Sequence, residues 1–456
     1  MTNFVFSRRA MQARINDLAK TLSPTQLTAI INRLNATNAT RLHVMWELVI
    51  LHGLSQAGHL KHEQALPNGR CPDIRWTINK QDGGTLTIIG DITTISDDGL
   101  DAQNPLKYIS EEILRIASKF GLRPGNFWID VRGETTGPRH RSKMRLMLPE
   151  KAEMSSFIKT ELEPWFYSIR EAPAIKSRFD RTENNTSLQI IYDPNWESGG
   201  GSHTSYTVAT SKSINPLFSA LKGKVKQLNG ASDDSLRIII ACDGGCDLIR
   251  RGNRGKSHYT YSAREVAEDF LRQNSSIDAV LLVAIDEPHQ PFGSPPEYQM
   301  SYELIFAPLL ARSRRATNES IESLTAALHV ALPNLPRPLR PAYHSASLLK
   351  TPGVGYDQLG RYSMQGNKVT ISSRGLLRLL AGEISTEEFI RAHGWNEPTN
   401  HANPFASNLK NGFMISNLDV TGDVDSDDDK ITITIDKFDV AAAPFIFPSK
   451  DKTGNI

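Results

Sequence analysis

Two short runs of apolar residues, separated by a helical pattern, constrain the fold of this chain most. Leu236–Ala241 and Ala279–Ile285 are apolar almost throughout, as strands are in a sheet whose two faces are both covered. Between them, Ala263–Arg272 has the spacing of an amphipathic helix. Strand, helix and strand in this order predict an α/β fold. Similar alternation earlier in the chain extends this prediction over the sequence up to about residue 310.

The composition fits a folded protein of more than one domain. The 456 residues are about three times a typical domain length, so two or three domains are expected. Lys and Arg together number 52 against 50 Asp and Glu, which gives a formal charge of +2. A chain so nearly neutral has no overall field that would draw it to nucleic acid or to a membrane. Any site for a polyanion must therefore be a local patch.

The cysteines and the apolar runs indicate a reducing, aqueous environment. Three cysteines, Cys71, Cys242 and Cys246, cannot form a disulfide framework, and they lack the spacing of a zinc site. The first ten residues have no apolar segment of the kind found in secretory signals. The longest apolar run is far shorter than the ~20 residues needed to cross a bilayer. We therefore expect a cytoplasmic protein with no membrane partner.

Changes in composition along the chain suggest four parts. Residues 1–38 form a helical segment, with a capping box that begins at Ser23. Residues 39–332 are expected to form the main α/β domain. Residues 333–345 are rich in proline, which favours an extended linker over a helix. Residues 346–456 are expected to form a small α+β module.

The first part of the main domain has the predicted order helix, three strands, helix and strand. The expected elements are the helix at residues 39–56, strands Leu60–Leu66, Cys71–Ile78 and Thr85–Ile95, the helix Pro105–Phe120 and the strand Phe127–Val131. Acidic side chains occur on three of them: Glu47 on the first helix, Asp73 on the second strand and Asp91 on the third. Two carboxylates that converge from neighbouring strands can hold a hard cation such as Mg²⁺.

The segment from about residue 39 to 131 resembles the PD-(D/E)XK nuclease superfamily, which has the restriction-endonuclease-like fold. The resemblance is carried by His62-Glu63, by Gly69–Ile74 and by Ile89–Thr93, and it covers about one fifth of the chain. These motifs are similar to a branch of the superfamily that reads His-Glu, Arg-Pro-Asp-Phe and Glu-Ala-Thr. A later segment with lysines and a glutamine, Ala220–Gln227, precedes the strand around Ile238–Ile240, as in that branch. The resemblance implies a mixed sheet flanked by helices.

The resemblance also implies roles for individual residues. Asp73 and Asp91 would be ligands of Mg²⁺ or Mn²⁺, and Glu47 would be a third ligand or an acid just outside the ligand shell. His62 could lie beside the metal. Thr93 stands where the superfamily has a catalytic lysine. A threonine hydroxyl can hydrogen-bond a water molecule but cannot supply positive charge.

A lysine from another element could replace the missing motif lysine. Lys107 on the helix after the third strand and Lys224 on the later helix are the two candidates. The resemblance then predicts an endonuclease that hydrolyses DNA phosphodiester bonds. Stand-alone nuclease domains with an added module resemble bacterial defence effectors of the restriction or anti-phage type. The alternative is an inactive, nuclease-like subunit that binds nucleic acid or assembles with other protein subunits through its C-terminal module.

Two basic stretches are candidates for contacts with DNA phosphates. Their members are Arg139, Arg141, Lys143 and Arg145 in the first stretch, and Arg250, Arg251, Arg254 and Lys256 in the second. Lysine and arginine neutralise phosphates without reading the base sequence. An ordinary solvated surface would have the same composition.

Three further patterns are interpreted as turns and not as sites. Gly255-Lys256-Ser257 imitates the end of a P-loop, but the earlier glycine position holds Arg250, so no nucleoside triphosphate partner is expected. The acidic run that begins at Asp423 lacks the glycine of a calcium-binding loop, and it predicts a solvated hairpin tip. Asp243-Gly244-Gly245 is typical of a tight turn.

Overall fold

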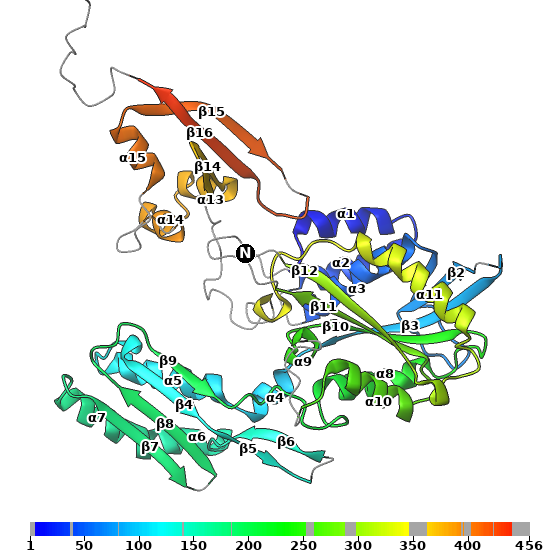
Figure 1. The fold of residues 1–456 in the computed structure, drawn as a ribbon, viewed down its shortest axis with the longest axis horizontal. Coiled ribbons are helices and arrows are strands. Elements are labelled where there is room, and N and C mark those ends of the chain that lie inside the picture. Colours follow the sequence, from blue (N-terminus) through cyan, green and yellow to red (C-terminus); the bar gives the residue numbers. More distant parts are fainter. Residues whose placement is uncertain are drawn as a thin grey trace, which may run out of the picture.

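A computed structural model (Figure 1) describes most of the chain and has a mixed α/β architecture. The described residues are 5–36, 40–80, 82–138, 141–183, 185–251, 260–287, 298–345, 363–393, 395, 403–422 and 424–439. They form a central part built on a six-stranded sheet, an inserted lobe and a C-terminal module. Among these residues, no helix combines the length and the apolar character needed to cross a lipid bilayer.

The central sheet has the strand order β1-β2-β3-β10-β11-β12. These strands are β1 (His59–His62), β2 (Ile74–Asn79), β3 (Thr85–Ile95), β10 (Leu236–Asp243), β11 (Ala279–Asp286) and β12 (Gln299–Phe306). The neighbours β3, β10 and β11 run parallel, whereas the outer pairs are antiparallel. Strand β10 is buried along its whole length and β11 along all but its last residue. The α/β fold predicted from the two apolar runs is therefore confirmed.

Helices cover both faces of this sheet (Figure 1). One face packs against α1 (Arg8–Leu18), α2 (Pro24–Asn35), α3 (Thr40–Ser55) and α11 (Asn318–Ala331), and the other against α8 (Pro216–Leu228), α9 (Asp247–Arg251) and α10 (Ala263–Gln273). Alternate residues of β3 belong to different cores: Ile88 and Ile92 face α3, whereas Ile89 and Ile95 face α8. The same alternation places Asp91 on the α8 side.

A separate lobe is inserted between β3 and β10. It contains α4 (Asp98–Gln103), α5 (Leu106–Lys119), β4 (Phe127–Val131), β5 (Gly133–Thr136), β6 (Lys143–Leu146), α6 (Lys151–Phe157), α7 (Glu163–Glu171), β7 (Ser177–Glu183), β8 (Thr186–Tyr192) and β9 (Gly200–His203). Strands β7, β8, β4 and β9 form a sheet of their own, and β5 pairs with β6. The lobe has its own hydrophobic core, which includes Ile113, Phe127 and Phe166.

The predicted order of elements is found, but its last helix and strand do not join the central sheet. The helix expected at Pro105–Phe120 and the strand expected at Phe127–Val131 both exist, as α5 and β4, but they belong to the lobe. The parallel neighbour of β3 is instead β10. Hydrophobic periodicity indicates the type of an element but not the sheet it joins. The range 39–332 therefore holds two cores, that of the central part and that of the lobe.

Both segments that flank the range 39–332 pack against the central part. Helices α1 and α2 share one hydrophobic core with α3 and the sheet. Residues 333–345 do not form the free linker that their prolines predicted: the backbone nitrogen of Leu339 donates to the carbonyl of Val5 at 2.7 Å. Ala342 is fully buried in the same core. Proline excludes a helix, but it leaves the apolar side chains free to pack.

The C-terminal module has a four-stranded sheet with the order β13-β14-β16-β15 and a small core of its own. Its elements are β13 (Ser363–Gln365), β14 (Lys368–Ser372), α13 (Ser373–Leu380), α14 (Thr386–Ala392), α15 (Pro404–Lys410), β15 (Phe413–Thr421) and β16 (Lys430–Phe438). The module contains both helices and strands, as the predicted α+β class requires.

The acidic tip between β15 and β16 is not the solvated loop that its composition predicted. The carboxylate of Asp427 accepts hydrogen bonds from the backbone nitrogens of Arg8 and Arg9, at 2.6 and 3.2 Å. Asp429 forms an ion pair with the Arg9 side chain at 2.6 Å. Negative charge is favourable at the first turn of a helix. The tip therefore binds the module to the beginning of α1.

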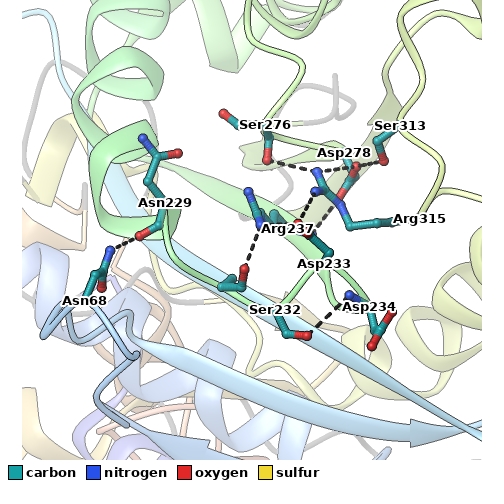
Figure 2. A network of polar contacts seen from close by, with 11 residues as sticks. Asn68, Asn229, Ser232, Asp233, Asp234, Arg237, Ser276, Asp278, Ser313 and Arg315 are labelled. Carbon is teal, nitrogen blue, oxygen red and sulfur yellow. Dashed lines mark hydrogen bonds and ion pairs between the residues drawn. The ribbon is translucent and has the colours of Figure 1, made fainter.

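A buried polar network joins the beginnings of β10 and β11 (Figure 2). Asp278 accepts hydrogen bonds from the backbone nitrogen of Arg237 at 2.8 Å and from Arg315 Nε at 3.2 Å. Its other carboxylate oxygen accepts from the hydroxyl of Ser313. Because the carboxylate, 1% exposed, has a donor on each oxygen, this network stabilises the end of the sheet.

Candidate active site

The structure places Asp73 and Asp91 side by side. Ile74 of β2 pairs with Gly90 of β3 in antiparallel register, so the preceding Asp73 lies opposite Asp91. One carboxylate oxygen of Asp73 accepts a hydrogen bond from the backbone nitrogen of Ile92 at 2.7 Å. The two carboxyl groups are close enough that one donates a hydrogen bond to the other when it is protonated. The beginning of β2 and the middle of β3 thus form a pair of acids.

Asp91 is fully buried and only partly neutralised. Its Oδ1 atom lies 2.5 Å from Nζ of Lys224, whereas its Oδ2 atom is buried and accepts no hydrogen bond. Burial, together with the charge of Asp73, raises the pKa of Asp91 to about 8, although Lys224 acts in the opposite direction. Burial and Asp73 therefore favour the protonated form of Asp91, and positive charge nearby favours the carboxylate.

The two candidate lysines lie in different parts of the molecule. Lys224 projects from α8 onto Asp91. Lys107 lies on α5 of the inserted lobe, where it is exposed and 3.7 Å from Glu111, so it does not supply charge to the acid pair. Thr93 is buried two residues beyond Asp91 on the same face of β3. Of the two candidate lysines, Lys224 is therefore the one that lies beside the acid pair.

Glu47 belongs to a separate chain of contacts next to the acid pair. Arg33 of α2 donates to both of its carboxylate oxygens, at 2.8 and 3.0 Å, and Nε2 of His62 lies 3.3 Å away. Burial alone would raise the pKa of Glu47, but the hydrogen bonds from His62 and Arg33 outweigh it and lower this pKa. The carboxylate of Glu47 therefore has a guanidinium and an imidazole as its partners.

His62 connects Glu47 to the acid pair. Its Nδ1 donates to the backbone carbonyl of Asp73 at 2.8 Å. Burial would lower the pKa of His62, but the bonds to Glu47 and to the Asp73 carbonyl raise it. The imidazole therefore fixes the peptide group that carries Asp73.

Two residues near the site carried no recognisable sequence signal. Arg33 borders the apolar face of α2, and only the structure shows that it reaches Glu47. His43 of α3 lies 3.0 Å from the hydroxyl of Thr94. Burial lowers the pKa of His43, with contributions from Lys224 and Arg33, although Glu47 and Asp73 act in the opposite direction. His43 precedes Glu47 by one helical turn, a spacing that could have indicated a shared face.

The donor set at Asp73 and Asp91 fits a hard divalent cation only in part. Among the residues that the structure describes, no three His, Cys, Asp or Glu side chains are grouped to hold a metal ion. A pair of carboxylates with one unpartnered buried oxygen nevertheless suits Mg²⁺, which is often bound by one or two carboxylates and keeps several waters. These two aspartates are therefore the residues that would hold such an ion.

The predicted basic residues have different surroundings. Lys143 and Arg145 are exposed on β6, and Arg141 is exposed just before this strand. Arg250 is committed elsewhere, because it forms an ion pair with Asp247 at 2.6 Å and lies over the ring of Tyr343. Arg251 ends α9. Arg139, Arg254 and Lys256 lie outside the described residues.

A cleft of about 840 Å³ lies between the central part and the inserted lobe. Its walls include the end of β3 at Thr94 and Ile95, the first turns of α8, and Lys143 and Arg145 of β6. Asp73, Asp91 and Lys224 do not line the cleft, but Thr94 follows Asp91 by three residues on the same strand.

Comparisons of this chain with protein-family models, with curated proteins and with solved structures gave no match. The function must therefore be argued from the geometry of Asp73, Asp91 and Lys224.

Proposed function

We propose that this protein is a metal-dependent endonuclease that hydrolyses DNA phosphodiester bonds. The observation that carries the proposal is the 2.5 Å contact between Lys224 and Asp91, next to a second carboxylate at Asp73. A pair of acids and a lysine at one place supply both signs of charge that this hydrolysis needs. The resemblance to PD-(D/E)XK nucleases implied both aspartates, and Lys224 was one of two candidates for the missing lysine.

Asp73 and Asp91 would hold the metal ion. Mg²⁺ or Mn²⁺, when bound, lowers the pKa of a water molecule and neutralises charge on the phosphate. Asp91 must first lose its proton, because only a carboxylate is a good ligand for a hard cation. The pKa of about 8 therefore makes the binding of a metal ion at this site dependent on pH.

Lys224 supplies the positive charge that Thr93 cannot. Its side chain is 21% exposed, so it borders both the buried Asp91 and solvent. A positioned ammonium stabilises negative charge that develops on a phosphate in the transition state. Glu47 and His62 act indirectly, because they fix the peptide group of Asp73.

The test is a cleavage assay on plasmid DNA. We expect cleavage with Mg²⁺ or Mn²⁺, none with a chelator, and none with an Asp91→Ala variant that binds DNA as the wild type does. Cleavage that survives both the chelator and the substitution would refute the assignment of Asp91.

One observation favours a second function. Because the described residues contain no group of three metal-binding side chains, the fold could serve as an inactive subunit that binds nucleic acid or assembles with other proteins. Retention of DNA by the wild type without any cleavage, with either metal, would support this alternative. A role in bacterial defence stays a prediction in both cases.

A further inference from the structure

The cleft beside the acid pair has walls from two parts of the molecule that hydrogen bonds hold in place. Ser142, before β6, donates to the carbonyl of Thr210 at 3.0 Å, and the hydroxyl of Thr210 donates back to the carbonyl of Ser142 at 2.9 Å. The backbone nitrogen of Leu146 donates to the side chain of Asn104 at 2.8 Å. The β5–β6 hairpin is thus tied to the segment that leads into α8, and the cleft is a built feature of the fold.

The cleft leads toward the proposed catalytic residues along two elements. On β3, Thr94 lies three residues from Asp91, about 10 Å along the strand. On α8, Ala220 of the cleft wall lies four residues before Lys224, about 6 Å along the helix axis. These distances correspond to two or three nucleotides of a stacked strand, which rises about 3.4 Å per nucleotide.

The charged groups of the cleft suit a phosphate backbone. Lys143 is exposed, and none of the described carboxylates forms an ion pair with it. Arg145 pairs with Glu150 at 3.4 Å, but both side chains are largely exposed, so this pair is weak. Lys143, Arg145 and Glu150 are the charged residues of the lining, and they leave a surplus of one positive charge.

An aromatic ring in the wall suits a base. Tyr206 lines the cleft and is partly exposed, and its hydroxyl donates to Asp101 at 2.9 Å. This bond fixes the edge of the ring, whose centroid lies 5.8 Å from that of the His203 ring. Rings of this kind stack on bases in proteins that bind single strands, beside a basic groove that follows the backbone.

The size of the cleft suits a single strand of DNA and not a duplex. A volume of 840 Å³ equals a cube of about 9 Å on a side, whereas the major groove of B-DNA alone is about 12 Å wide. A cavity of this volume holds a ligand of a few rings. One strand of two or three nucleotides meets that limit, and a double helix does not.

We infer that the cleft binds a single strand of DNA two or three nucleotides from the bond that is cut, so that single-stranded DNA is cut in preference to an intact duplex. This inference rests on the proposed nuclease function. Lys143 and Arg145 contact the backbone of the bound strand, and Tyr206 stacks on one of its bases.

The test compares one circular DNA in its single-stranded and its double-stranded form, with full-length protein and Mn²⁺. We expect cleavage of the single strand to be about tenfold faster or more. The paired substitution Lys143→Ala with Arg145→Ala should raise KM for the single strand more than it lowers kcat, because it removes binding and not chemistry. The matched control is Arg115→Ala with Lys119→Ala on α5, which removes the same charges from a surface outside the cleft.

A binding measurement separates this inference from the proposed function. Fluorescence anisotropy of a labelled single-stranded oligonucleotide and of its duplex is measured with the Asp91→Ala variant in a chelator. Tighter binding of the single strand than of the duplex supports the inference even if no DNA is cut. In the variant that lacks Lys143 and Arg145, the slope of the logarithm of the binding constant against the logarithm of salt concentration should become shallower by about 1.4. Equal binding and equal cutting of the two forms would overturn the inference while leaving the nuclease function intact.

Discussion

Two buried aspartates in the central sheet have opposite surroundings. Asp278, just before β11, receives a backbone nitrogen, a guanidinium and a hydroxyl. Asp91, on β3, meets one lysine and a second carboxylate, and one of its oxygens has no hydrogen bond. Both side chains are at most 1% exposed. Burial alone therefore does not distinguish these two acids, whereas their hydrogen-bond partners do.

The largest effect is expected on kcat when Asp91, the acid with fewer hydrogen-bond partners, is replaced. Replacement of Asp91 by asparagine should lower kcat by about 10²- to 10³-fold, because a preorganised charge is lost from the reacting centre. The free energy of unfolding should change little at pH 8, since the variant also relieves repulsion with Asp73. Steady-state cleavage and urea unfolding measure the two quantities. An active Asp91→Asn variant would remove the contrast between the two aspartates.

The contribution of Lys224 is tested by a pair of matched lysines. Lys224→Met should reduce kcat by about a hundredfold, since methionine keeps the length of the side chain but removes its charge. Lys107→Met makes the same chemical change on the surface of the inserted lobe and should leave cleavage unaltered. Equal losses in the two variants would show that Lys224 has no special role beside Asp91.

The fully paired acid should affect stability and not chemistry. We expect Asp278→Asn to lower the free energy of unfolding by about 3 kcal/mol, because it leaves buried donors of Arg237 and Arg315 without a charged acceptor. The kcat of the folded fraction should stay near that of the wild type. Urea unfolding and active-site titration measure these quantities. A loss of kcat without a loss of stability would reverse the comparison.

The dependence of stability on pH distinguishes Asp91 from its asparagine variant. The pKa of Asp91 is raised to about 8 in the folded protein, so the folded state binds a proton that the unfolded state has released. Stability therefore falls as pH rises from about 4 to 8. Asp97 and Asp243, whose pKa values burial raises to about 6, act in the same direction. The difference between wild type and Asp91→Asn in urea unfolding at several pH values isolates Asp91, and a difference that does not vary with pH would contradict this assignment.

The smallest effect is expected at an acid that is intermediate between the two. Asp427 accepts two backbone hydrogen bonds on one oxygen and has no partner on the other. Asp427→Ala should cost about 1 kcal/mol, as the loss of a helix cap does, without changing kcat. Thermal unfolding of the full-length variant measures this cost. A change in cleavage rate would connect the C-terminal module to the catalytic residues.

The sequence predicted local structure and the acid pair better than it predicted long-range partners. The strands β10 and β11 followed from continuous apolar runs, and Asp73 and Asp91 from a short motif. The sheet that β4 joins could not be predicted, because periodicity is a local signal and strand partners lie far apart in the chain. For the same reason, the sequence could not decide between Lys107 and Lys224 as the lysine beside Asp91. Only the folded chain brings Lys224 to Asp91.

Other parts of the site were not predictable for a different reason. The contacts of Arg33 and His43 depend on how α2 and α3 pack on the sheet, and single charged or polar residues on a helix give no sign of their partners. The acidic tip at Asp427 has the composition of a solvated loop, yet Asp427 accepts hydrogen bonds from the backbone nitrogens of Arg8 and Arg9 at the beginning of α1. Composition describes the tip correctly but says nothing of what lies opposite.

The position of the inserted lobe in the chain has a consequence during synthesis. Asp91 and Lys224 are 133 residues apart, and the whole lobe is translated between them. At about 5–20 residues per second, the ribosome releases the lysine roughly ten seconds after the aspartate. A nascent chain therefore carries an incomplete set of charges until the lobe and α8 have emerged.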